Sequence, residues 1–288
     1  MKTVANLGSI ANEFSVKERL AMIKAAGFDG ADITLCGPQV ALLEGDYLAA
    51  ARDVRAEADR LGLPILQAHA PFDSTTAYAE EKLELTKRSI EFAGICGAHC
   101  IVVHPIQHLS YFDDPKNAEI LFEYNMEFYG KLKDVADRYG IRIATENMWR
   151  TNKMRQVIDH SVCSRPEEFC RYVDELQRLY GNTFTGCLDL GHTVLVGVDP
   201  CQMIGAMGHR VGALHVHDND YHKDLHLAPG LGSMNYNAIT AALKEIGYKG
   251  HFTLECHASS LDRAGTHLYL QFLAGVSRQL ADKSEGIL

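Results

Sequence analysis

Residues of the types that bind metal ions stand where apolar segments of this chain give way to polar turns. The segments are rich in β-branched and aliphatic residues, as in Ile-Val-Val-His104 and Phe-Thr-Leu-Glu255. Parallel strands that end this way at one edge direct such side chains toward one point. Nine residues follow the pattern: His69, His104, Glu146, Asp189, His192, His215, Asp224, His226 and Glu255.

Strand-like and helix-like patterns alternate along the whole chain. Apolar runs predict strands at residues 3–7, 28–35, 64–69, 99–104, 141–146, 183–189, 211–217 and 252–255. Helices are predicted after them, at 15–27 with a Ser15–Glu18 capping box, 45–61, 77–97, a long helix through 139, 165–180, 200–208, 237–247 and 260–280. Long loops at 106–115, 147–164 and 218–234 would form the rim of a pocket.

Alternation alone fits a doubly wound sheet as well as a barrel. An open sheet gathers its site at one switch point, whereas ligands at nearly every strand end favour a closed ring. We therefore predict an α/β protein with a single domain, residues 1–288, folded as a (β/α)8 TIM barrel. Its site should lie at the C-terminal face of the strands.

Composition and absent motifs exclude several classes of function. A net charge of −9 argues against non-specific attraction to nucleic acid or to an anionic membrane surface. Eight cysteines without a Cys-x-x-Cys spacing indicate buried free thiols, and no apolar run is long enough to span a membrane, so we expect a cytoplasmic protein. Phosphate-binding, dinucleotide-binding and nucleophile-elbow motifs are missing from the sequence.

Four of the nine residues end four consecutive predicted strands. Glu146, Asp189, His215 and Glu255 offer three carboxylates and one imidazole, a set suited to Mn²⁺, Co²⁺, Mg²⁺ or Zn²⁺. The alternative is that these acids face water or cap the next helix. A metal site explains better why all four follow an apolar run.

Two short motifs add further candidates. In Asp189-Leu-Gly191-His192, the glycine is expected to allow a sharp turn, so that His192 faces the pocket beside Asp189. In His215-Val-His217, side chains alternate along the strand, and we expect only one of the two histidines to face the barrel mouth.

The remaining candidates would bind either additional metal or substrate. His69 and His104 each precede a proline that ends a strand, and Asp224 and His226 lie in a loop stiffened by Pro229. Trp149, the only tryptophan, follows Glu146 and could form an apolar wall for a sugar-like substrate or simply pack the loop.

Taken together, these segments resemble the xylose isomerase-like barrel superfamily, in the group of sugar phosphate isomerases and epimerases. The matching segments include Leu-Asp189-Leu-Gly-His192, His215-Val-His217-Asp218 and Asp224-Leu-His226-Leu-Ala-Pro-Gly. In ketose epimerases of the group, the positions of Glu146, Asp189, His215 and Glu255 hold one divalent metal. The resemblance further implies that Glu146 and Glu255 are the catalytic acid and base and that His192 contacts the substrate.

The resemblance also leaves alternatives open. Those epimerases carry a glutamate where this chain has Asn152 and an arginine where it has Tyr221, so the substrate is not fixed. The superfamily includes apurinic/apyrimidinic endonucleases with three zinc ions, and all nine matching residues here are of the right type. A keto-inositol dehydratase-type lyase shares the same enediolate chemistry.

The sequence therefore predicts a metal-dependent isomerase or epimerase that acts on a small carbohydrate, a sugar phosphate or a keto acid. We expect one divalent ion, with ligands for up to three. Neither a membrane nor a nucleic acid partner is expected, and the chain could form a homo-oligomer.

Overall fold

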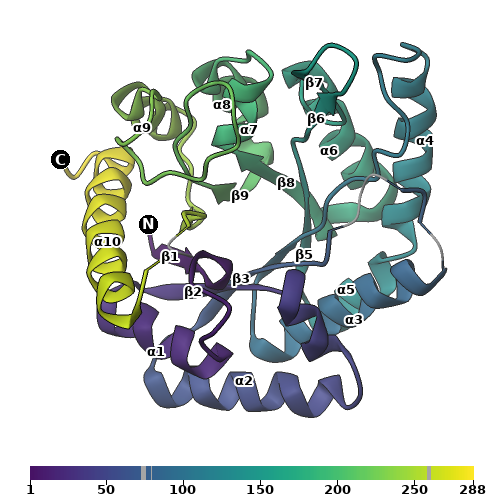
Figure 1. Ribbon diagram of the computed structural model, residues 1–288. Coiled ribbons are helices and arrows are strands. Elements are labelled where there is room, and N and C mark those ends of the chain that lie inside the picture. Colours follow the sequence, from purple (N-terminus) through teal and green to yellow (C-terminus); the bar gives the residue numbers. More distant parts are fainter. Residues whose placement is uncertain (73–75, 79, 258–260) are drawn as a thin grey trace.

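Eight parallel strands form the barrel in the computed structural model, which describes residues 1–72, 76–78, 80–257 and 261–288 (Figure 1). Their order is β10-β1-β2-β3-β4-β5-β8-β9. A parallel bridge between Val216 and Leu254 joins the two ends of this order, so the ring is nearly closed. The strands are β1 (Thr3–Asn6), β2 (Gly30–Thr34), β3 (Ile65–His69), β4 (Cys100–Val102), β5 (Arg142–Glu146), β8 (Phe184–Asp189), β9 (Val211–His215) and β10 (Phe252–Leu254).

Helices surround the ring of strands (Figure 1). The predicted capping box is present, because Ser15 and Glu18 bond to each other's backbone N–H groups at the start of α1. The α-helices are α1 (Val16–Ala26), α2 (Tyr47–Leu61), α3 (Glu80–Cys96), α4 (Asn117–Gly130), α5 (Lys133–Tyr139), α6 (Pro166–Tyr180), α7 (Leu190–Leu195), α8 (Pro200–Met207), α9 (Tyr236–Glu245) and α10 (Arg263–Glu285). Short 3-10 helices are η1 (Leu7–Ser9), η2 (Gly37–Leu43), η3 (Gly181–Thr183) and η4 (Gly208–Arg210).

Two predicted segments were wrong in detail. The long helix expected through residue 139 is two helices, α4 and α5, and α4 ends at Gly130, where a Cβ would lie 2.4 Å from the Tyr180 hydroxyl oxygen. The rim loop at 147–164 contains an antiparallel hairpin of β6 (Trp149–Asn152) and β7 (Val157–His160).

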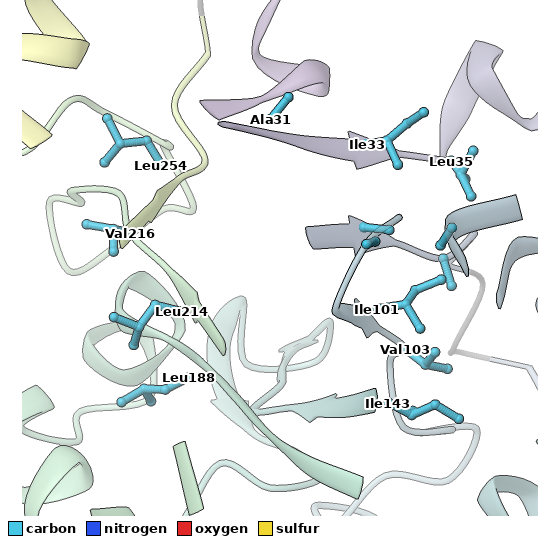
Figure 2. Packing of buried hydrophobic residues seen from close by; sticks show 14 of the residues in the cluster. Ala31, Ile33, Leu35, Ile101, Val103, Ile143, Leu188, Leu214, Val216 and Leu254 are labelled. Carbon is cyan, nitrogen blue, oxygen red and sulfur yellow. The ribbon is translucent and has the colours of Figure 1, made fainter. Parts of the chain in front are cut away.

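Side chains on the strands alternate between two cores. Larger apolar residues such as Ile33, Ile143 and Leu214 belong to the main core between strands and helices, where Figure 2 shows them around the ring. Small apolar residues on five positions form a separate cluster inside the barrel: Cys100, Val102, Ala144, Cys187 and Ala213. The residue two positions after each of these points the same way, which brings side chains at the strand ends together above these small apolar residues.

Two further predictions can be compared with the structure. All eight cysteines are free, and six of them are buried, as predicted. Among the described residues, no helix is both long and apolar enough to cross a membrane.

One half-buried acid outside the barrel mouth makes stability depend on pH. Tyr111 in the rim loop donates a hydrogen bond to Glu168 in the first turn of α6, and the other carboxylate oxygen of Glu168 has no partner. Burial raises the pKa of Glu168 to about 7. The pKa of Glu168 is higher in the folded than in the unfolded protein, so the folded state favours the neutral carboxyl group. The free energy of unfolding therefore falls as pH rises from about 4.5 to about 7 and Glu168 ionises.

We therefore expect Glu168→Gln to raise the free energy of unfolding at pH 8 by about 1–3 kcal/mol, with little change at pH 4.5. Denaturant unfolding at both pH values would measure this. The exposed neighbour Glu167 provides the control, since Glu167→Gln should change little at either pH. Equal effects of the two substitutions at pH 8 would contradict the assignment.

Candidate metal centre

Three strand ends and the residue after β10 bring the four predicted metal ligands together. The Nδ1 atom of His215 lies 2.7 Å from Glu146 Oε1, 3.3 Å from Glu255 Oε2 and 3.9 Å from Asp189 Oδ2. Ligand atoms of Asp189, His215 and Glu255 all lie within 4.8 Å of one another. His215 thus stands at the centre of a set we call the inner cluster: Glu146, Asp189, His215 and Glu255.

Two more predicted residues join this cluster through the second oxygen of Glu146. His104 Nε2 lies 2.8 Å from Glu146 Oε2, and His69 Nε2 lies 3.7 Å from it. Glu146 therefore faces imidazoles from both sides and is almost wholly buried. Both histidines, which the sequence assigned to either metal or substrate, are placed where they could contact an ion held by Glu146.

The other three predicted ligands form an outer cluster beside the first. His192 Nε2 and His226 Nε2 each lie 3.4 Å from Asp224 Oδ2. Trp149 Nε1 donates a hydrogen bond to the same oxygen at 3.3 Å. Hairpin β6–β7 is therefore attached to the outer cluster through the indole of Trp149, which the sequence could place only on the rim.

His217 also belongs to the site, and the sequence analysis missed it. Its Nε2 lies 3.1 Å from both oxygens of Asp189, and its ring stacks on that of His226 with centroids 4.1 Å apart. The prediction that only one of His215 and His217 faces the barrel mouth was wrong, because residues two apart on a strand share a face. The same period that located the other ligands would have identified His217.

Gly191 has a different role from the predicted one. It lies in the first turn of α7 without a positive φ, so no unusual turn requires a glycine. A Cβ at this position would lie 2.0 Å from Cε1 of His217, so glycine is needed to make room for that ring. Asp189 caps α7 by accepting a hydrogen bond from the His192 backbone N–H at 2.7 Å, so the helix-capping alternative is also partly realised.

The histidines are oriented by backbone carbonyls. Nδ1 of His69 donates to Ala70 O, Nδ1 of His192 to Asn147 O, and Nδ1 of His226 to Glu255 O, each at 2.8 Å. Such bonds fix the tautomer and leave Nε2 unprotonated toward the site when the ring is neutral, as metal-binding histidines require.

The donor set fits divalent metal. Carboxylate oxygens and imidazole nitrogens suit Mn²⁺, Co²⁺, Mg²⁺ and Zn²⁺. Buried polar atoms without a hydrogen-bond partner are rare in folded proteins. Several occur here, namely His215 Nε2, His217 Nδ1 and Asp224 Oδ1. Ions bound within the two clusters would supply partners for those that face them.

Charges in the site compensate one another. Burial raises the pKa of Glu146, but His215 and His104 outweigh it and hold that pKa well below its usual range. Burial lowers the pKa of His215 and His226, yet the surrounding carboxylates raise both to about 9. Without metal, protonated imidazoles therefore neutralise the carboxylates at pH 7.

A cavity of about 670 Å³ opens above the clusters, of the size that holds small molecules. Arg150 donates to the carbonyls of Gln107 and Leu109 at 2.7 and 2.9 Å, so it ties two of the predicted rim loops together. Seven of the nine predicted ligands line the cavity. Its lining residues are His69, Phe72, His104, Gln107, Glu146, Met148, Trp149, Arg150, Thr151, Lys153, His192, Asp224, His226 and Glu255.

Comparison with protein families agrees with the barrel fold. The profile of the family described as xylose isomerase-like TIM barrel matches residues 20–274. The chain belongs to this family. An uncharacterized protein of Methanocaldococcus jannaschii is 29% identical over 231 residues, which cover 75% of this chain and 73% of that protein.

Solved structures of other proteins share the fold of this xylose isomerase-like barrel over nearly the whole chain. A D-tagatose 3-epimerase-like protein superposes with a TM-score of 0.74 and 21% identity, covering 100% of this chain and 98% of its own. A D-psicose 3-epimerase, solved in the presence of D-fructose, superposes with a TM-score of 0.76 and 16% identity, covering 97% and 99%. At these identities the likeness establishes the barrel fold.

The contact between Gly191 and His217 predicts a steric effect. Gly191→Ala should lower the free energy of unfolding by about 1–3 kcal/mol, because the added methyl overlaps a buried ring. Gly205→Ala is the matched control, since Gly205 lies in α8 and a Cβ there meets nothing within 4 Å. That control should be neutral or stabilise by up to about 1 kcal/mol. Thermal or denaturant unfolding of both would test the contact, and equal stabilities would contradict it.

The protonated imidazoles predict that metal binding depends on pH. An ion in the inner cluster must displace a proton from His215, and an ion in the outer cluster must displace one from His226, because the raised pKa values keep both rings charged below about pH 9. Zinc affinity should therefore rise between pH 6.0 and 7.5, by about tenfold per pH unit for each proton displaced. Calorimetry in two buffers of different ionisation enthalpy would count the protons. Binding without proton release would contradict this electrostatic account.

Proposed function

We propose that this protein is a divalent-metal-dependent isomerase or epimerase that moves a proton next to the carbonyl of a small carbohydrate, sugar phosphate or keto acid. One observation carries the proposal. Two carboxylates, Glu146 and Glu255, flank Nδ1 of His215 at 2.7 and 3.3 Å, on the floor of a cavity of small-molecule size. A pair of carboxylates on either side of one position can exchange a substrate proton between its two faces or two neighbouring carbons.

Each residue has a role in this proposal. A divalent ion, when bound, supplies a Lewis acid that stabilises negative charge on substrate oxygens. Glu146 or Glu255 accepts the proton α to the carbonyl, which leaves an enediolate, and one of the two returns a proton. His192 holds a substrate hydroxyl, and Trp149 excludes water from the reacting carbons. Asp189 and His215 complete the set that would hold the ion.

Relatives of the same fold support this choice of chemistry. Of the structural neighbours described above, one is named as a D-psicose 3-epimerase and one as a D-tagatose 3-epimerase-like protein. The number of ions is proposed as one, in the inner cluster. The outer cluster contains ligand types for more.

A second candidate is an apurinic/apyrimidinic endonuclease with three zinc ions. The observation that favours it is the convergence of all nine expected residues, including Asp224 and His226 in the outer cluster. The net charge of −9 disfavours the nuclease, because binding to DNA requires several contacts from lysine or arginine to phosphates.

Metal content and two assays distinguish the candidates. Proton exchange with deuterated solvent, followed by NMR on a panel of ketoses, their phosphates and keto acids, should reveal exchange at the carbon next to the carbonyl. Loss of water from a keto-inositol in the same panel would indicate the lyase instead. Cleavage of abasic duplex DNA, together with three tightly bound zinc ions, would replace the proposal by the nuclease.

Separate roles for the acids predict separate effects of substitution. Glu255→Gln keeps an oxygen that can face the ion but cannot accept a proton, so turnover should fall by about 10²–10⁴-fold while metal still binds. Asp189→Asn should mainly weaken metal binding, and added metal should partly restore turnover. Exposed Glu245 on α9 provides the control, since Glu245→Gln should leave exchange unchanged. Undiminished exchange in Glu255→Gln would leave Glu146 as the only base.

A further inference from the structure

A carboxylate that the sequence analysis did not single out lies directly below the inner cluster. Asp32 sits in the middle of β2, points into the barrel and is completely buried. No lysine or arginine forms an ion pair with it in the part of the chain that the structure describes. Burying a carboxylate that no lysine or arginine compensates is costly, so its presence in a barrel core requires an explanation.

Two amides hold this carboxylate in a fixed orientation. Asn6 Nδ2 and Gln67 Nε2 donate to Asp32 Oδ2 at 3.3 and 3.2 Å. Their own oxygens are occupied, because Gly8 N donates to Asn6 Oδ1 at 2.7 Å and Thr253 Oγ1 donates to Gln67 Oε1 at 3.3 Å. The amide nitrogens must therefore face Asp32, and the whole layer is arranged to keep an acceptor in place.

Asp32 faces the ring nitrogen of His215 that points away from the inner cluster. Asp32 Oδ2 lies 3.8 Å from Nε2 of His215, while Nδ1 of the same ring faces the carboxylates of the inner cluster. Both His215 Nε2 and Asp32 Oδ1 are buried without a hydrogen-bond partner. A ring that binds an ion through Nδ1 must carry its proton on Nε2, and that proton would point toward Asp32.

We propose that Asp32 is a positioning residue that keeps His215 in the Nε2–H tautomer and so prepares Nδ1 to bind a divalent ion. It touches neither the ion nor the substrate. The inference rests on the proposed function only in taking the inner cluster to bind a divalent ion. It adds a buried carboxylate–histidine pair, supplied by β2, that supports the ligands from β5, β8, β9 and β10.

The test compares metal affinity with the stability of the metal-free protein. Asp32→Asn removes a fully buried charge that no lysine or arginine compensates, so metal-free protein should unfold at the same temperature as the parent chain or a higher one. Its dissociation constant for Zn²⁺, measured by competition with a chelating dye at fixed pH, should rise about 10–100-fold. Affinity and stability would thus move in opposite directions, which a merely structural role could not produce.

Asp29→Asn is the matched control at the other end of the barrel. Asp29 pairs with Arg278 and accepts from Thr3 N at 2.8 Å, so this variant should lose stability but bind Zn²⁺ as tightly as the parent chain. NMR of ¹⁵N-labelled histidine in the zinc-loaded parent protein should show His215, assigned with His215→Asn, protonated at Nε2.

Each outcome separates this inference from the proposed function. If the parent chain binds no divalent ion, the proposed metal-dependent function fails and the role of Asp32 fails with it. If the parent chain binds Zn²⁺ tightly and Asp32→Asn binds it equally well, the positioning role alone is refuted. An Nδ1–H tautomer of His215 in the zinc-loaded protein would refute it as well.

Discussion

The alternation of side chains along the strands of a closed barrel is the constraint from which the site follows. Inside the ring, small residues such as Ala144, Cys187 and Ala213 leave room in the middle of the barrel. Two residues further along each strand, the same inward direction belongs to an acid or a histidine. Because the strands are parallel and the ring is nearly closed, these side chains meet at one end.

Such a concentration of carboxylates would repel itself without compensation. In the metal-free chain, protonated imidazoles supply the compensating positive charge. The carboxylates stabilise this charge and so raise the pKa values of His215 and His226. Protons and metal ions thus compete for the same groups. Backbone carbonyls that accept from the histidines keep the rings in place under either condition.

Most of the barrel could be predicted because strand and helix periods are local properties of the sequence. The eight strands fall within about two residues of their predicted ends, and the capping box of α1 is as expected. The division of the helix before β5 could not be predicted, because no proline interrupts it and Gly130 is explained only by its contact with Tyr180. Hairpin β6–β7 was missed because its residues lie within a polar rim loop.

The site was predictable to the extent that its residues end strands. Seven of the nine predicted ligands form the two clusters, and His69 and His104 lie beside Glu146 of the inner cluster. His217 was missed through an error about which strand residues share a face, whereas Asp32 gives no signal at all. It stands in the middle of an apolar strand, and only its contacts with residues of β1, β3 and β9 indicate a role.

The hydrogen bond from Trp149 to Asp224 has a practical consequence. The chain contains one tryptophan, and its indole N–H rests on the carboxylate at the centre of the outer cluster. Indole emission excited at the red edge of protein absorption therefore originates at the site itself. The unlabelled protein carries a fluorescent reporter whose immediate surroundings are the outer cluster and the cavity wall.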